Sequence, residues 1–176
     1  KNIQNTLNKI NKNKKQKTKL LFSAHGLPEK IIKKGDPYQN QIEKTVNKIL
    51  KNMNNKEFSH TICYQSKVGP LKWIGPSTED EIIKSSKDKD TIVLIPIAFV
   101  SEHSETLVEL DIEYKEAAIL NGCENYYRVP ALGISKDFIN GLYKLIIKQK
   151  NNSILNEKIC KSKFKECFYE TFWENK

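Results

Sequence analysis

The stretch TIVLIPIA, residues 91–98, carries the strongest strand signal in the chain. It is rich in β-branched residues and almost wholly apolar, which is typical of a strand that helices cover on both faces of a parallel sheet. The stretch that follows, residues 102–120, has the apolar spacing of an α-helix. We expect its sheet-packing face to consist of Leu107, Leu110, Tyr114 and Ala117. A buried strand followed by an amphipathic helix is the building unit of α/β folds.

The same alternation recurs on both sides of this unit. Further strand-like runs occupy residues 20–24, 59–65 and 125–129. Helix-like runs extend from Gly35-Asp36-Pro37 as far as Met53, and over residues 78–86 and 135–147. Such alternation implies right-handed crossovers and parallel pairing. The sequence therefore predicts a doubly wound, three-layer α/β domain with a four-stranded parallel sheet over residues 20–150. A basic linker or helix remnant at residues 1–19 would precede it, and a tail at residues 151–176 would follow it.

The 176-residue chain has a formal net charge of +9, but this charge is unevenly spread. Residues 1–19 contain seven lysines and no acid, whereas residues 102–116 contain six acids and one lysine. Nucleic-acid readers typically use arginine forks and interleaved aromatic side chains, and the single arginine of this sequence is Arg128. We therefore expect no nucleic-acid partner.

Hydropathy and cysteine usage indicate an intracellular protein without a membrane span. No run of 18 or more apolar residues occurs, so the sequence predicts no transmembrane helix. The four cysteines Cys63, Cys123, Cys160 and Cys167 are scattered, and no charged-then-apolar leader opens the chain. A disulfide framework is therefore not expected, and a reducing, cytoplasmic compartment is the default.

Candidate functional residues follow the predicted strands at their carboxyl ends, where doubly wound folds bind ligands. His25 ends the first strand, residues 65–73 follow the second, and residues 101–105 follow the third. A neutral imidazole takes up protons near neutral pH and binds divalent metals. We expect His25 and Glu105 to face each other over a common cavity, as a metal or proton-transfer site that His103 joins. The alternative for His25 is a turn histidine that a backbone carbonyl satisfies.

Acidic and aromatic residues extend this candidate site. Glu105, Glu109 and Glu113 are spaced by four residues and so form a carboxylate ladder along the predicted helix. Such a ladder suits the conduction of cations or protons to a site, and the alternative is an ordinary solvated face. Trp73, in a loop stiffened by glycine and proline, and Tyr38 could each stack on a large flat ligand or anchor a hydrophobic lid.

Several segments together resemble the C-terminal half of the ferrochelatase family, enzymes that insert Fe²⁺ into a porphyrin to complete haem. The resemblance covers about residues 20–147. It rests on the blocks SAHGLP (23–28), GDPY (35–38), QSKVGP (65–70), KWIGPST (72–78), PIAFVSEHSETLVELDIEY (96–114) and YYRVPALG (126–133). The segment SEHSETLVELDIEY, residues 101–114, is highly specific.

The resemblance implies a role for each candidate residue. His25 would be the family's active-site histidine and Glu105 its partner glutamate, and both would contact the iron. The other residues it implies are His103 beside this catalytic pair, Glu102, Glu109 and Glu113 on an acidic path for metal and protons, and Trp73, Tyr38, Gln65 and Ser66 in contact with the porphyrin.

Partners and cofactors follow from the same resemblance. Fe²⁺ and the porphyrin are substrates, and no organic cofactor is expected. A second, similar α/β domain would precede residues 1–19 and complete the porphyrin pocket. Some family members hold a [2Fe–2S] cluster through three cysteines of a C-terminal extension. Because this tail offers only Cys160 and Cys167, no such cluster is expected.

Other functions stay open at this point. One is a related tetrapyrrole chelatase that uses cobalt or coproporphyrin. Another is an α/β fragment or binding domain that is inactive because half of the pocket is missing. Because haem precursors are apolar, we also expect peripheral contact with the inner membrane, which the lysine-rich flank could assist on an anionic surface.

Overall fold

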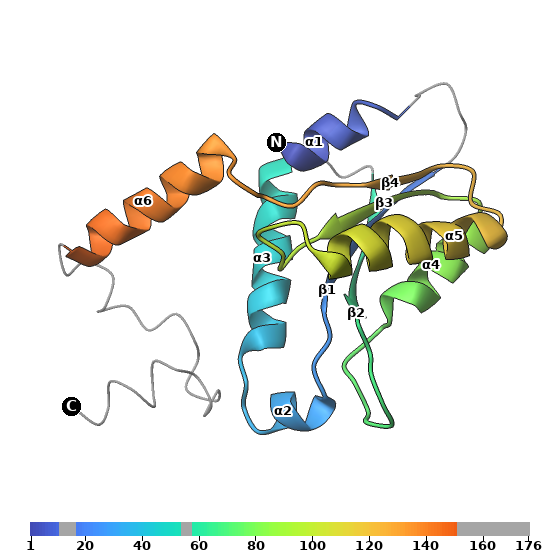
Figure 1. Cartoon of the computed structure of the whole chain (residues 1–176), viewed down its shortest axis with the longest axis horizontal. Helices are drawn as coiled ribbons and strands as arrows, with labels where there is room; N and C mark the ends of the chain where they lie inside the picture. The colour runs from blue at the N-terminus through green and yellow to red at the C-terminus, as the bar shows by residue number, and fades with distance from the viewer. Residues whose placement is uncertain (11–16, 54–57, 151–176) are drawn as a thin grey trace.

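The computed structural model describes residues 1–10, 17–53 and 58–150 (Figure 1). Its strands are β1 (Thr18–His25), β2 (Ser59–Gln65), β3 (Thr91–Pro96) and β4 (Tyr126–Arg128). Its helices are α1 (Asn2–Leu7), α2 (Glu29–Lys33), α3 (Tyr38–Met53), α4 (Thr78–Lys87), the π-helix η1 (Glu105–Glu113), α5 (Tyr114–Leu120) and α6 (Lys136–Lys150). The short helix α2, which begins directly after Pro28, was not predicted.

All four strands pair in parallel in one sheet, in the order β2-β1-β3-β4. In the middle of the sheet, Phe22 of β1 lies opposite Ile62 of β2 and Ile95 of β3. Every residue of β3 is buried, which explains why this strand has a continuous apolar sequence. The predicted α/β fold with a four-stranded parallel sheet is confirmed.

Alternate side chains of the sheet contribute to two separate hydrophobic cores, one on each face. Phe22 packs in the core that includes Val46 of α3. Leu21, the preceding residue, packs in the core that includes Ile82 of α4 and Leu110 of η1. In Figure 1, α3 accordingly lies on one side of the sheet, and α4 and α5 lie on the other. The sheet is therefore the middle of three layers.

The segment expected as one α-helix over residues 102–120 begins at Glu105 as a π-helix, and α5 continues it. In a π-helix the backbone hydrogen bonds run from i to i+5, so each turn is wider than an α-helical turn. The buried residues are Thr106, Leu110, Tyr114 and Ala118. The expected face was therefore wrong at Leu107, which is 47% exposed.

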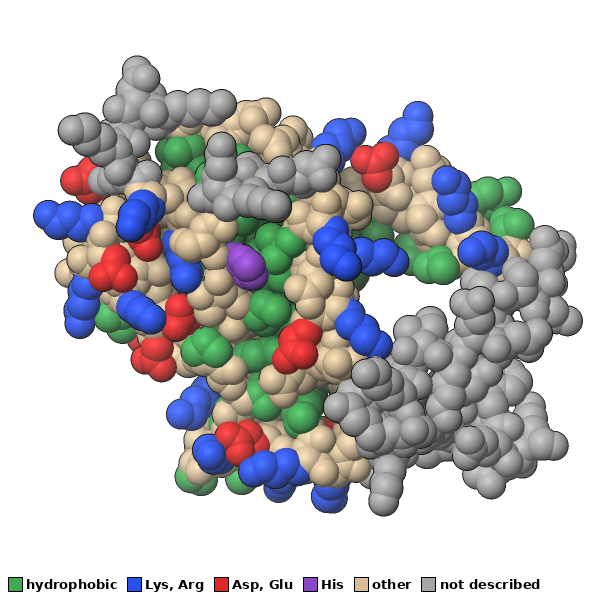
Figure 2. Space-filling view, turned by 180° about the vertical axis from the view of Figure 1, so that it is seen from behind, with side chains coloured by type: hydrophobic (Ala, Val, Ile, Leu, Met, Phe, Trp, Pro, Cys, Tyr) green, Lys and Arg blue, Asp and Glu red, His purple; other side chains and the backbone are tan. Residues whose placement is uncertain are grey.

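The two ends of the described chain pack differently. α1 lies against the sheet and buries Leu7 in the core, while α6 projects from the body of the domain (Figure 1). Large hydrophobic residues of α6 are exposed: Ile139, Leu142, Tyr143, Leu145, Ile146 and Ile147. Figure 2 shows hydrophobic side chains at the surface of this projecting helix, with basic side chains between them. α6 is thus an amphipathic helix whose apolar residues lack cover within the described part of the chain.

Two further expectations concern the C-terminal tail and the absence of a membrane-spanning helix. The tail, with Cys160 and Cys167, lies outside the described residues. Within the described ranges, no helix combines the length and the apolar character that crossing a membrane requires.

Candidate functional site

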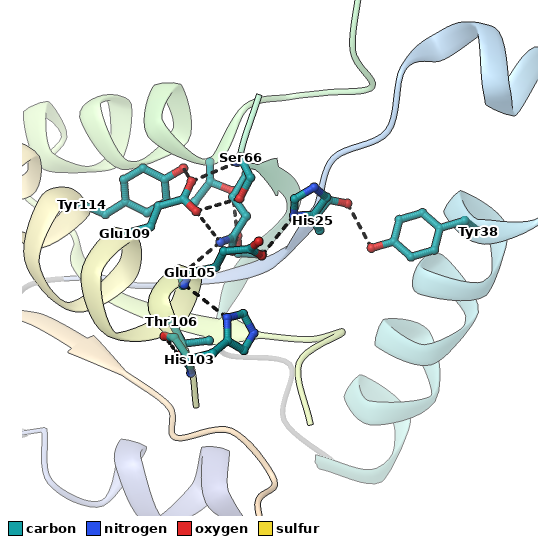
Figure 3. Close-up of polar contacts among 11 residues, drawn as sticks. His25, Tyr38, Ser66, His103, Glu105, Thr106, Glu109 and Tyr114 are labelled. Carbon is teal, nitrogen blue, oxygen red and sulfur yellow. Dashed lines mark hydrogen bonds and ion pairs between the residues drawn. The ribbon is translucent and has the colours of Figure 1, made fainter. Parts of the chain in front are cut away.

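The carboxyl ends of β1 and β2 meet the start of η1 at one edge of the sheet (Figure 3). His25 is the last residue of β1 and lies opposite Gln65, the last residue of β2. Glu105 opens η1, and its Oε2 lies 3.2 Å from Nδ1 of His25. The structure thus brings the expected histidine and glutamate into contact, at the edge where doubly wound folds bind ligands.

The His25–Glu105 pair is open to solvent on one side and held on the other. The two side chains are 41% and 39% exposed. Tyr38, at the start of α3, donates its hydroxyl hydrogen to the backbone carbonyl oxygen of His25 at 3.0 Å. Burial raises the pKa of Tyr38, which keeps this hydroxyl a donor. When Glu105 accepts from Nδ1, a neutral His25 keeps its lone pair on Nε2, which is then the ring nitrogen able to take a proton or contact a metal.

A buried amide supports Glu105 from the side of the core. Gln65 is 1% exposed, and its Oε1 accepts from the hydroxyl of Ser23 at 2.8 Å. Its Nε2 donates to the backbone carbonyl oxygen of Glu105 at 3.3 Å and to Oε2 of Glu109 at 2.9 Å. Because each polar group of this amide has a partner, its orientation is fixed. Gln65 therefore lies beneath η1 with its amide bound within the fold, beside the cavity that borders Gly26 and Trp73, and its contact with a porphyrin stays a prediction.

Glu109 is a residue of η1, and its carboxylate reaches the end of β2. Its Oε1 accepts from the backbone N–H of Ser66 at 2.9 Å and from the hydroxyl of Tyr114 at 2.7 Å. Its Oε2 accepts from the hydroxyl of Ser66 at 2.7 Å, in addition to the amide of Gln65. Ser66 has a φ of 61°, in the left-handed region that non-glycine residues rarely adopt. The end of β2 is thus bonded to η1 through one carboxylate.

The remaining acids of the expected path lie in different surroundings. Glu102 accepts from Nη1 of Arg128 at 2.8 and 3.0 Å and from the backbone N–H of Ala131 at 2.9 Å. Partial burial raises the pKa of Glu102, but the hydrogen bonds, chiefly those from Arg128, outweigh burial and leave the pKa below its ordinary value. Glu113 is exposed in the last turn of η1. Among the described contacts, none of the three path acids Glu102, Glu109 and Glu113 touches His25; Glu105 of the expected pair does.

His103 holds the start of η1. Its Nδ1 accepts from the backbone N–H of Glu105 at 3.2 Å, and its own backbone N–H donates to Oγ1 of Thr106 at 2.9 Å. Its ring packs on Phe99, with the ring centroids 5.2 Å apart. Figure 3 shows His103 on the backbone side of Glu105, while His25 lies at the carboxylate. His103 is therefore linked to the pair through the backbone that positions Glu105.

Trp73 and Gly26 form the part of the site next to β2. The indole N–H of Trp73 donates to the backbone carbonyl oxygen of Val68 at 3.1 Å. A Cβ atom built on Gly26 would lie 3.0 Å from the carbonyl oxygen of Gln65 and 3.1 Å from Cε3 of Trp73, so only glycine lets the indole approach this closely. A cavity of about 150 Å³ borders Gly26 and Trp73. Pockets for drug-sized ligands have roughly 300–1,000 Å³, so this cavity alone is too small for a macrocycle.

Comparison with protein families identifies the family of the chain. The sequence model of the ferrochelatase family matches residues 1–150, which is most of the chain. The chain belongs to the ferrochelatase family.

Two curated proteins named ferrochelatase illustrate the relationship. The chain is 62% identical over 155 residues to ferrochelatase of Pelagibacter ubique strain HTCC1062 and 51% identical over 156 residues to that of Rickettsia prowazekii strain Madrid E. Each match covers 85% of this chain and 45% of the relative. The chain thus spans less than half the length of these curated ferrochelatases.

The candidate site also contains supporting residues that sequence reasoning missed. The hydroxyls of Ser23 and Thr78, both fully buried, lie 2.8 Å apart beneath Gln65. Ser23 could have been noticed, because a polar residue inside an apolar strand needs a buried partner. Tyr114 was placed only on the apolar face, yet its hydroxyl bonds to Glu109. Among the described residues, no group of three or more histidine, cysteine, aspartate or glutamate side chains is arranged to hold a metal ion.

Proposed function

We propose that this chain is the C-terminal part of a ferrochelatase and carries its metal-inserting pair, His25 and Glu105. The whole protein inserts Fe²⁺ into protoporphyrin, forms protohaem and releases two protons, and it uses neither an organic cofactor nor an iron–sulfur cluster. The observation that carries the proposal is the 3.2 Å contact between Nδ1 of His25 and Oε2 of Glu105 at the carboxyl end of the sheet. Membership of the ferrochelatase family supports the choice of reaction.

The pair has the chemistry that metal insertion needs. Insertion replaces two pyrrole N–H bonds by Fe–N bonds, so two protons must leave as the metal enters. Nε2 of His25 takes the first proton, and Glu105 stabilises the imidazolium that forms and relays the proton toward solvent. The relay leaves the imidazole proton on Nε2, so the second proton follows the same route after exchange with solvent has returned that proton to Nδ1. Imidazole and carboxylate are also suitable ligands for Fe²⁺, so the same pair contacts the metal before transfer.

Aromatic side chains on either side of the pair line the porphyrin-binding surface of this proposal. Tyr38 is half-buried and bonded to the backbone of His25. Trp73 is half-buried and packs on Gly26, the residue after His25. Flat aromatic rings stack favourably on other π-systems. Ser66, half-buried at the end of β2, is a further contact in the proposal.

The acidic path of the proposal begins at Glu113. This carboxylate is exposed at the far end of η1 and is therefore open to hydrated Fe²⁺. Glu102 and Glu109 lie along the same segment, but hydrogen bonds from neighbouring residues occupy them. Glu113 is thus the acid that we propose for attracting the metal, and Glu105 the acid that receives it.

The rest of a full-length ferrochelatase is the partner that completes the pocket. About 40% of each side chain of the pair is exposed, and electrostatic interactions strengthen once water is excluded. The curated relatives are more than twice as long as the matching part of this chain. The exposed apolar residues of α6, at the opposite end of the sequence from α1, offer a surface that such a second part covers.

Peripheral contact with a membrane surface is the remaining element of the proposal. Porphyrins are apolar, and residues 1–19 carry seven lysines and no acid. Each basic residue near an anionic membrane contributes about 1 kcal/mol. Cosedimentation with anionic and with neutral vesicles tests this element, and equal binding to both would contradict it.

The activity is best tested in a chimera in which this chain replaces the matching part of the Pelagibacter ubique ferrochelatase. We expect the chimera to convert protoporphyrin and Fe²⁺ into protohaem, and His25→Ala and Glu105→Gln each to lower kcat by about 10²–10⁴-fold. His60→Ala and Glu116→Gln are the matched controls, because both residues are exposed and lie on β2 and α5, away from the pair. Near-normal turnover by either test variant would contradict the proposed roles. Preference of the active chimera for coproporphyrin or Co²⁺ would contradict the proposed substrates.

A further inference from the structure

The carboxylate of Glu109 has a hydrogen-bond donor for every lone pair that it presents. An ionised carboxylate accepts at about four positions. Two donors reach each oxygen of Glu109, at distances between 2.7 and 2.9 Å. These donors come from Gln65, Ser66 and Tyr114. In this arrangement Glu109 has no lone pair left for a metal ion, and it can take a proton only by giving up one of these bonds.

Two of the four bonds come from a residue with unfavourable backbone geometry. Ser66 has a φ of 61°, and such a conformation persists at a non-glycine residue only where the surroundings fix it. The backbone N–H and the hydroxyl of Ser66 both donate to Glu109. Glu109 is therefore the group that compensates the strain at this turn.

The turn at Ser66 is linked to Glu105 by one further hydrogen bond, which Gln65 donates. Gln65, the residue before Ser66, divides its Nε2 donors between the carboxylate of Glu109 and the backbone carbonyl of Glu105. Tyr114, the first residue of α5, also donates its hydroxyl hydrogen to Glu109. As a result, one carboxylate joins the end of β2, the first turn of η1 and the start of α5 (Figure 3).

We propose that Glu109 is a positioning residue. Through Gln65 and Ser66 it fixes the turn of η1 that holds Glu105 against His25, and it does not carry metal or protons itself. This inference rests on the proposed function of the His25–Glu105 pair. It divides the carboxylate ladder into residues of different kinds: Glu105 at the pair, Glu109 bonded within the fold, and Glu113 exposed at the end of η1.

Variants that leave the carboxylate intact separate a positioning role from a carrier role. Tyr114→Phe and Ser66→Ala each remove one donor and free one lone pair of Glu109. A positioning role predicts that both lower kcat in the chimera, in the same direction as Glu109→Gln and with the KM for Fe²⁺ unchanged. A carrier role predicts the reverse: both variants keep or raise kcat, because the carboxylate becomes more available, and Glu109→Gln raises the KM for Fe²⁺.

We expect Glu109→Gln to lower kcat by about ten- to a hundredfold, the effect of a small misplacement of reacting groups. The amide of glutamine presents a donor where Gln65 and Ser66 also donate, so size is kept while two acceptor positions are lost. Glu116→Gln, an equal change of charge at an exposed position of α5, is the control and should leave kcat unchanged. Normal kcat in Glu109→Gln, or unchanged kcat in both donor variants, would overturn the proposal.

Amide hydrogen exchange in the 176-residue chain tests the positioning role without any enzymatic assay. The backbone N–H of Ser66 donates to Oε1 of Glu109, so we expect it to exchange at least about tenfold faster in Glu109→Ala, which removes both carboxylate oxygens, than in the unaltered chain or in Glu116→Ala. Urea unfolding of the same samples shows whether the effect is local. Unchanged protection of the Ser66 amide would overturn the proposal even if the chimera is active. If the unaltered chimera is inactive, the proposed function fails, and the exchange result still decides whether Glu109 holds this turn.

Discussion

Two glutamates close to the start of η1 illustrate how single residues acquire different roles. Glu102 accepts from the guanidinium of Arg128 and the backbone N–H of Ala131, which neutralise and fix it. Glu105 contacts His25 and is 39% exposed. Both are glutamates in one acidic segment, so residue type and spacing alone do not separate them. Their hydrogen-bond partners, which come from distant parts of the sequence, separate them.

The Glu102–Arg128 pair predicts a defined pH dependence of stability. The pKa of Glu102 in the folded protein lies below its ordinary value of 4.5. The ionised form therefore stabilises the fold above the pKa of the unfolded chain, and this contribution disappears as the pH falls through the folded-state pKa. We expect Glu102→Gln to lower the free energy of unfolding by about 1 kcal/mol or less near pH 7, because the pair is partly exposed. Urea unfolding between about pH 7 and pH 3 should show the difference shrink as the pH falls. A penalty that is equally large there would contradict the assignment, and Glu116→Gln should show none at either pH.

Gly26 predicts a steric effect on the proposed porphyrin surface. In Gly26→Ala the new Cβ would lie 3.0 Å from a backbone oxygen that cannot yield easily and 3.1 Å from the indole of Trp73. We expect Trp73 to shift, stability to fall by about 1–3 kcal/mol, and the chimera to bind protoporphyrin more weakly. Porphyrin titration by fluorescence and urea unfolding measure the two effects. Gly141→Ala, where the added Cβ meets open space, is the control. Unaltered porphyrin affinity in Gly26→Ala would argue against Trp73 as part of the binding surface.

At the scale of elements, η1 is where sequence reasoning and structure differ most. Leu110 and Tyr114 are buried in both the expected and the observed helix, so they do not distinguish α-helical from π-helical spacing. Leu107 was expected in the core and is exposed, whereas Thr106 is fully buried and was not expected. The choice depends on which backbone hydrogen bonds form, i to i+4 or i to i+5, and side-chain hydropathy over so few residues does not determine it.

The register of η1 can be tested with two leucines of the same helix. Leu110 is fully buried, so Leu110→Ala should lower the free energy of unfolding by about 2–5 kcal/mol. Leu107 is 47% exposed, so Leu107→Ala should change it by about 0.5 kcal/mol or less. Urea unfolding of the two variants gives the comparison directly. Equal losses, or a larger loss at Leu107, would contradict the π-helical register.

For the molecule as a whole, the sequence predicted the sheet better than the site. Strand alternation with helices requires parallel pairing, and it places His25, Gln65 and Glu105 at one edge without any knowledge of side-chain contacts. The roles within that edge could not be predicted, because Gln65 turned out to be buried and Glu109 to be bonded to the end of β2. Which groups form hydrogen bonds between the sheet and η1 depends on small differences in the positions of their atoms. The spacing of residues along the sequence carries no information about such differences.

The exposed apolar residues of α6 lead to a prediction about how the chain contacts the rest of a ferrochelatase. Leu142 and Ile146 are exposed one turn apart, so in the chain alone Leu142→Glu and Ile146→Glu should leave Tm nearly unchanged. In the chimera the same changes should lower Tm and protohaem formation, because in the proposed function the second part of the protein covers these residues. Lys144→Glu is the control on the same helix. An equal loss of Tm in the chain alone would show that residues of this chain cover the helix instead.

In the proposed function, His25 and Glu105 act as one unit in metal insertion. Steady-state protohaem formation by the chimera with His25→Ala, Glu105→Gln and both changes together tests it most directly. Residues that act as a unit have strongly non-additive effects. We therefore predict that each single change lowers kcat by about 10²–10⁴-fold and that the double variant is about as slow as the slower single variant. Losses that multiply in the double variant, or near-normal rates in either single variant, would contradict the claim.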